Sequence, residues 1–198
     1  METTNMSHEE SLKIIQQSIA NTRHKLSEES PFYLMWGWLA LGAGIIQLAL
    51  LTFTDSHYHW VSWPVLMAAG GIISGVMASK IKKKKKHTSQ IDRLMVFIWG
   101  GMIIAIVFTL LMAFQIGWNA SYLLVIMLYG LGTFISGGAL KFKPLIFGGI
   151  AAWLLGIVGI LASGWFPDFR SYLILLCASL VVSYLIPGYM LKNSKGNV

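Results

Sequence analysis

The chain has 198 residues, of which 56% are hydrophobic and only 12% are charged. Soluble domains carry about 25% charged residues, so this composition excludes an ordinary soluble globular protein. The formal net charge is +7, and its meaning depends on where along the chain the basic residues lie.

We expect the first 31 residues to form a cytoplasmic amphipathic helix. Ser7 and Glu10 have the spacing of a capping box. Ser30-Pro31 has the pattern of an N-cap and a first-turn proline, which predicts that a membrane span begins there. The residues with heptad-like spacing are Leu12, Ile15, Ile19 and Leu26. Three interpretations of this apolar stripe remain open: it lies on the inner membrane surface, packs on the cytoplasmic loops, or pairs with a partner helix or a second copy.

Six long apolar stretches follow, and none of them contains Asp, Glu, Lys or Arg. They are residues 32–53, 60–79, 94–115, 118–140, 144–163 and 171–191. Each is long enough to cross a hydrocarbon core of roughly 30 Å at about 1.5 Å per helical residue. The sequence therefore predicts an all-α integral membrane protein with one six-helix domain over residues 32–191 and a cytoplasmic tail at 192–198.

The basic residues predict how the chain is threaded. With six spans, all 15 Lys and Arg residues except Arg170 lie on one side of the membrane. Short basic loops stay in the cytoplasm, so both termini are expected to be cytoplasmic. This placement explains the net charge by topology, and we expect no nucleic acid partner.

The six stretches also resemble one another in pairs. The odd-numbered stretches begin near Gly37, Gly100 and Gly148, and the even-numbered stretches end near Gly75, Gly137 and Gly188. This pattern predicts three parallel helical-hairpin repeats. Small residues four apart, as in Gly71-xxx-Gly75, Gly132-xxx-Ser136 and Gly148-xxx-Ala152, favour close helix packing. We expect this packing inside the bundle, and the alternative is a dimer interface. Pro187 is expected to kink or loosen the last span.

The densest group of charges lies between the second and third stretches. It consists of Lys80, Lys82, Lys83, Lys84, Lys85 and Lys86. Such a group sets topology, and it also suits anionic lipid head groups or an acidic partner. We therefore expect membrane lipids to be partners of this loop.

Few residues suggest a chemical site. His57 and His59 in the first outer loop, with Asp55, are weak candidates for a metal site or a pH sensor, although a full ligand set is lacking. Gln47 is the most polar residue deep within a span, and it either lines a path for a neutral solute or bonds to a neighbouring helix. We expect no catalytic residues, no bound cofactor and no resident metal.

The stretch from Leu12 to Gln47 is the distinctive part of the chain. Its heptad-like helix leads into Pro31-Phe-Tyr-Leu-Met-Trp-Gly37-Trp38. This resembles the start of uncharacterised small six-helix bacterial inner-membrane proteins, in which an amphipathic N-terminal helix meets an aromatic Phe/Tyr-Leu-x-Trp-Gly-Trp sequence. The resemblance implies a bacterial plasma membrane and brings no activity with it.

The absence of ionisable residues inside the spans shapes the functional expectation. Ion-coupled transport and membrane-embedded chemistry usually leave such residues there. We therefore expect a non-enzymatic component that acts through protein or lipid contacts at its cytoplasmic face. The alternative is a small transporter or channel for a neutral or apolar solute.

Overall fold

In the computed structural model of the chain, residues 8–54, 57–84, 90–165 and 168–193 are described, and every regular element among them is a helix. Six helical stretches are long and apolar enough to cross a membrane. They are Ser30–Phe53, His59–Lys80, Gln90–Ile116, Trp118–Ala139, Lys143–Leu161 and Phe169–Asn193. The prediction of an all-helical, multi-pass membrane protein with six spans is confirmed.

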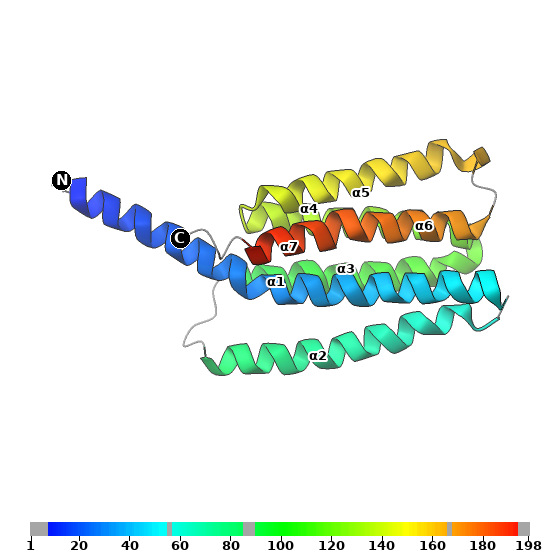
Figure 1. The fold of residues 1–198 in the computed structure, drawn as a ribbon, viewed down its shortest axis with the longest axis horizontal. Coiled ribbons are helices and arrows are strands. Elements are labelled where there is room, and N and C mark those ends of the chain that lie inside the picture. Colours follow the sequence, from blue (N-terminus) through cyan, green and yellow to red (C-terminus); the bar gives the residue numbers. More distant parts are fainter. Residues whose placement is uncertain (1–7, 55–56, 85–89, 166–167, 194–198) are drawn as a thin grey trace.

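The helices run side by side along one axis (Figure 1). The first five long helices are α1 (His8–Phe53), α2 (Ser62–Lys84), α3 (Gln90–Ile116), α4 (Trp118–Ala139) and α5 (Lys143–Leu161). The last span consists of α6 (Phe169–Leu180), the π-helix η3 (Val181–Leu185) and α7 (Ile186–Asn193). Two short 3-10 helices, η1 (His59–Val61) and η2 (Ser163–Trp165), lie in connections at one end. We call that end distal, and the end that holds the N-terminus proximal.

The first span differs from its prediction at Ser30-Pro31. A single helix, α1, runs from His8 to Phe53 with Pro31 inside it, so the predicted break between an N-terminal helix and the first span is wrong. An interior proline removes one helical hydrogen bond, and a helix tolerates the loss where other groups satisfy the freed carbonyl. As a result, α1 continues beyond the proximal end of the bundle (Figure 1). The amphipathic stripe on residues 12–26 stays a prediction, because those side chains lie outside the described part.

The last span lies at the centre of the bundle. Its three segments contact α1, α4 and α5. By contrast, α3 packs its backbone closely only against α4, and α2 only against α1 and η1, among the described residues. One bond that joins α2 to α1 runs from Trp36 Nε1 to Ser74 Oγ, at 3.0 Å. The bundle therefore has a packed centre and two peripheral helices, α2 and α3.

Pro187 explains why the last span changes its winding. Proline has no N–H, so the helical hydrogen bond that its nitrogen would have donated is missing. Immediately before it, the Ile186 N–H bonds to the Val181 carbonyl, which is the wider spacing of a π-helix. The predicted loosening near the proximal end of this span thus takes the form of a π-helical turn, η3.

Glycines allow the central helices to approach one another through their backbones. A Cβ atom added at Gly149 of α5 would lie 2.6 Å from the Gly130 carbonyl oxygen and 2.8 Å from the Phe134 nitrogen of α4. One added at Gly148 would lie 3.1 Å from the Ser183 Cα in η3. The space normally filled by a side chain is therefore filled by the neighbouring helix.

The glycines of the three proposed hairpins do not share one environment. Gly37 and Gly148 face the last span closely, whereas a Cβ added at Gly100 would meet nothing within 4 Å. The same holds for Gly71 and Gly75, so their predicted role in packing inside the bundle is wrong. These two glycines lie on the exposed face of α2, away from α1. The hairpin repeat itself stays a prediction.

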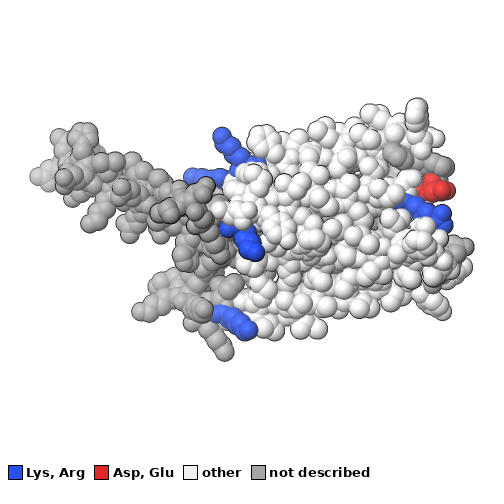
Figure 2. All heavy atoms as spheres, viewed as in Figure 1, with Lys and Arg blue, Asp and Glu red and all other residues white. Residues whose placement is uncertain are grey.

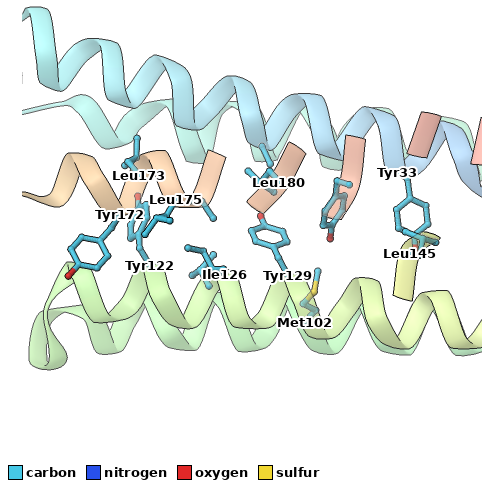
Figure 3. Close-up of a cluster of buried hydrophobic side chains, with 14 of the residues drawn as sticks. Tyr33, Met102, Tyr122, Ile126, Tyr129, Leu145, Tyr172, Leu173, Leu175 and Leu180 are labelled. Carbon is cyan, nitrogen blue, oxygen red and sulfur yellow. The ribbon is translucent and has the colours of Figure 1, made fainter. Parts of the chain in front are cut away.

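Apolar and aromatic side chains from α4 and the last span fill the centre. Figure 3 shows Tyr122, Ile126 and Tyr129 projecting from α4 into this layer. Toward the proximal end, the ring of Tyr184 in η3 packs against Tyr129, with centroids 5.5 Å apart, and against Trp99 of α3 at 5.6 Å. Because α3 is joined to the centre by such side chains, it belongs to the bundle without close backbone contact to the last span.

We predict that Gly149→Ala destabilises the protein. The added methyl group would meet backbone atoms, which cannot rotate away, and overpacking of this kind costs about 1–3 kcal/mol. Thermal unfolding in detergent, followed by tryptophan fluorescence, should show a lower midpoint. The matched control is Gly71→Ala, where the methyl group enters open space. Equal unfolding midpoints for the two variants would show that the backbones of α4 and α5 are far enough apart at Gly149 to accommodate a methyl group.

Candidate functional site

Gln47 lies at the distal end, in the last turns of α1, and its side chain is only 1% exposed. Its Oε1 accepts two hydrogen bonds, one from Trp63 Nε1 at 2.6 Å and one from the Tyr122 hydroxyl at 2.9 Å. Its Nε2 lies 3.0 Å from His59 Nδ1. We call Gln47, His59, Trp63 and Tyr122 the distal polar cluster. It joins α1 to η1, α2 and α4.

The donors of this cluster determine the protonation of His59. An indole N–H can only donate, so the amide oxygen of Gln47 must face Trp63. The amide nitrogen of Gln47, which can only donate, then faces His59 Nδ1. His59 Nδ1 must therefore accept, and its ring is neutral with the proton on Nε2.

Aromatic rings enclose the distal polar cluster. The ring of Phe169, at the start of α6, packs edge-on against Tyr122 with centroids 4.8 Å apart. It also lies 6.3 Å from the ring of His59. Nearby, the Arg170 side chain donates to the Leu51 carbonyl of α1 at 2.8 Å. Five elements, namely α1, η1, α2, α4 and α6, therefore meet around one amide group.

This geometry bears on the two interpretations of Gln47. Both polar atoms of its amide are bonded to protein groups, which favours a packing role over a solute path. Trp63 and Tyr122 were missed as partners by the sequence analysis. The signal was available in principle, because a buried glutamine needs donors and acceptors. Trp and Tyr on neighbouring spans have apolar rings that also carry a hydrogen-bond donor.

The structure describes two of the three residues of the predicted metal site, His57 and His59. His57 is exposed in the turn before η1, and His59 uses Nδ1 to accept from Gln47. Within the described ranges, no three His, Cys, Asp or Glu side chains gather closely enough to hold a metal ion. Asp55, the third member of the predicted group, lies outside them.

Most of the described basic residues lie at the proximal end (Figure 2). The exposed lysines there are Lys80, Lys141, Lys143 and Lys192. Asp168 and Arg170 lie at the distal end, at the start of α6. The side chains of Lys82, Lys83, Lys84, Lys85 and Lys86, and those of Leu12, Ile15, Ile19 and Leu26, lie outside the described part, so their predicted contacts stay predictions.

A groove of about 200 Å³ lies between α3 and α4. Apolar residues line it, and they include Gly101 and Met102 of α3 and Leu131 and Gly132 of α4. Gln47 is not among the lining residues. The molecule thus offers a bonded polar cluster at the distal end, a basic proximal end, and an apolar groove on the side of α3 and α4.

Comparisons with known proteins identify no relative. No family model matches the chain, and neither the curated proteins nor the solved structures include a match.

We predict that Gln47→Leu destabilises the protein by leaving the donors of Trp63 and Tyr122 without an acceptor. An unsatisfied buried polar group costs about 1–3 kcal/mol, so the unfolding midpoint in detergent should fall.

The matched control is Tyr122→Phe, which removes one donor and leaves the amide bonded to Trp63 and His59. Because both single variants remove the bond between residues 47 and 122, the double variant should lose less than the sum of the two. Strict additivity would contradict a direct bond between these side chains.

Proposed function

We propose that this chain is a non-enzymatic component of the bacterial cytoplasmic membrane that acts through protein or lipid contacts at its cytoplasmic face. The observation that carries the proposal is the gathering of Lys80, Lys141, Lys143 and Lys192 at the proximal end. The N-terminal part of α1 leaves the bundle at the same end. The four lysines and the N-terminal part of α1 therefore lie at the same end of the molecule.

The orientation follows from these charges. Basic residues in short loops remain on the cytoplasmic side during insertion. The proximal end, with both termini, therefore faces the cytoplasm, and the distal polar cluster faces outward.

The length of α1 favours an external partner for the predicted apolar stripe. Residues 8–29 precede the first span, and they reach about 33 Å at a rise of about 1.5 Å per residue. The turn between α4 and α5 at the same end spans only residues 140–142, too few to cover a helix of that length. That turn alone cannot cover the stripe, and we propose a partner helix or the membrane surface as its neighbour.

No observation favours the alternative of a small transporter or channel for a neutral or apolar solute. Gln47, the residue that suggested it, has both amide atoms bonded to protein groups. The groove between α3 and α4 opens along the side of the bundle and is lined by other residues.

The orientation can be tested by labelling single cysteines. Cys177 is the only cysteine, so Cys177→Ala provides a background in which Lys143→Cys marks the proximal end and Gly164→Cys the distal end. In right-side-out vesicles, a membrane-impermeant maleimide should label the variant at position 164 and should label position 143 only after permeabilisation. The reverse pattern would overturn the orientation.

The contact function can be tested on the apolar stripe. We expect Ile15→Asp combined with Ile19→Asp to abolish cross-linking of the chain to partner proteins in native membranes, because the added charges disrupt an apolar helix contact. The control is Gln16→Asp with Gln17→Asp, which adds the same charge to the polar face. If the stripe variant and a deletion of residues 1–29 both keep every partner, the proposed protein contact is wrong.

A further inference from the structure

The groove between α3 and α4 exists because α3 has a glycine where a side chain would fill it. A Cβ atom added at Gly101 would meet nothing within 4 Å. The side chains of Phe97 and Ile104 nearby are 72% and 71% exposed, so this side of α3 faces outward. Met102 forms the inner wall and packs on Gly132 of α4. The groove is therefore open to the membrane side and closed toward the core.

Because the groove has an apolar lining, it favours a hydrocarbon ligand. Its residues are Ile98, Gly101, Met102, Ala105, Leu128, Leu131, Gly132 and Ile135, none with a polar side chain. An apolar cavity of about 150 Å³ is already large enough to stay dry and to bind benzene. The groove holds about 200 Å³ and borders the region that lipid chains occupy. Left empty, its walls would lose their dispersion contacts.

The depth of the groove indicates which leaflet it faces, and the charges at that end indicate which lipid head group it favours. Its α3 residues lie 8 to 15 positions after Gln90, where α3 begins, which is about 12–23 Å at a rise of about 1.5 Å per residue. Three of the four α3 residues lie in the proximal half of this helix, so the groove lies mainly in the leaflet at the proximal end. Exposed cations stand at this end of both helices, namely Arg93 on α3 and Lys141 and Lys143 after α4. Asp92 is the described carboxylate there, and three cations outweigh it.

We propose that this groove binds one acyl chain of an anionic phospholipid, whose phosphate is held by the cations at the proximal end. The inference deepens the lipid part of the proposed function and rests on it. It assigns the lipid contact to the α3–α4 side of the bundle, separate from the N-terminal part of α1.

Two adjacent glycines allow a matched test. Gly101→Leu fills the groove, whereas Gly100→Leu adds the same side chain to open space that does not line it. The purified full-length protein is titrated in mild detergent with phosphatidylglycerol, and bound lipids are counted by native mass spectrometry. We expect the wild-type chain and Gly100→Leu to retain one lipid, and Gly101→Leu to bind it about tenfold more weakly, as expected from loss of about two buried methylene groups.

The head group is tested separately. Arg93→Gln with Lys141→Gln should remove the preference for phosphatidylglycerol over phosphatidylethanolamine, and glycerophosphate without acyl chains should not compete. Competition by glycerophosphate would show a phosphate site without a chain site and overturn the proposal. Equal retention by the Gly100 and Gly101 variants would also overturn it, because it would show only nonspecific surrounding lipid.

Two further variants control for misfolding of Gly101→Leu and for a contribution of the N-terminal helix to lipid binding. If Gly101→Leu does not purify as a monodisperse protein, Ala105→Leu fills the same groove from the next turn of α3 and should give the same loss. Deletion of residues 1–29 should leave lipid retention unchanged, so failure of the groove and failure of the N-terminal contact are separable. Loss of the bound lipid on that deletion would contradict a site formed by α3 and α4.

Discussion

The bundle depends on the backbone contact that glycines allow between the last span and its neighbours. Between membrane helices there is no hydrophobic effect to drive association, so close van der Waals packing must do it. A Cβ added at Gly37 of α1 would lie 3.1 Å from the Tyr184 Cβ, and one at Gly148 of α5 would lie 3.1 Å from the Ser183 Cα. Side chains at either position would push the last span away from the centre, and α1 and α5 would lose their common neighbour.

The distal end is held by a different interaction. There the helices meet around the amide of Gln47, which bonds to His59, Trp63 and Tyr122. Individual hydrogen bonds between membrane helices contribute only about 0.6–2 kcal/mol each, but three on one amide fix the relative positions of several helices at once. Glycine packing at the centre determines how closely the helices approach one another. The distal polar cluster determines the position of the connecting helix η1 relative to α1, α2 and α4.

The sequence was sufficient for the six spans, because an uncharged stretch of at least 20 residues has few stable alternatives to a membrane helix. It was not sufficient for the glycines. Gly71 and Gly148 sit in the same small-xxx-small pattern, yet one faces open space and the other faces η3. Which face of a helix meets a neighbour is decided by the tertiary arrangement. Similarly, Gln47 was identified by its polarity, whereas the sequence did not identify Trp63 and Tyr122 as its partners.

The bundle has a closely packed centre, and it has an open groove between α3 and α4 at its periphery. Glycine inside a helix costs about 1 kcal/mol relative to alanine unless packing compensates. Gly148 and Gly149 are compensated by backbone contacts within the chain, but Gly101 has none. Within a single copy no described side chain fills the space beside Gly101, and the lipid chain we propose would contact it there. The proposed acyl chain would supply such a contact in the α3–α4 groove. This is one of the edges, with that of Gly71 and Gly75 on α2, where the chain leaves the space beside a glycine unfilled.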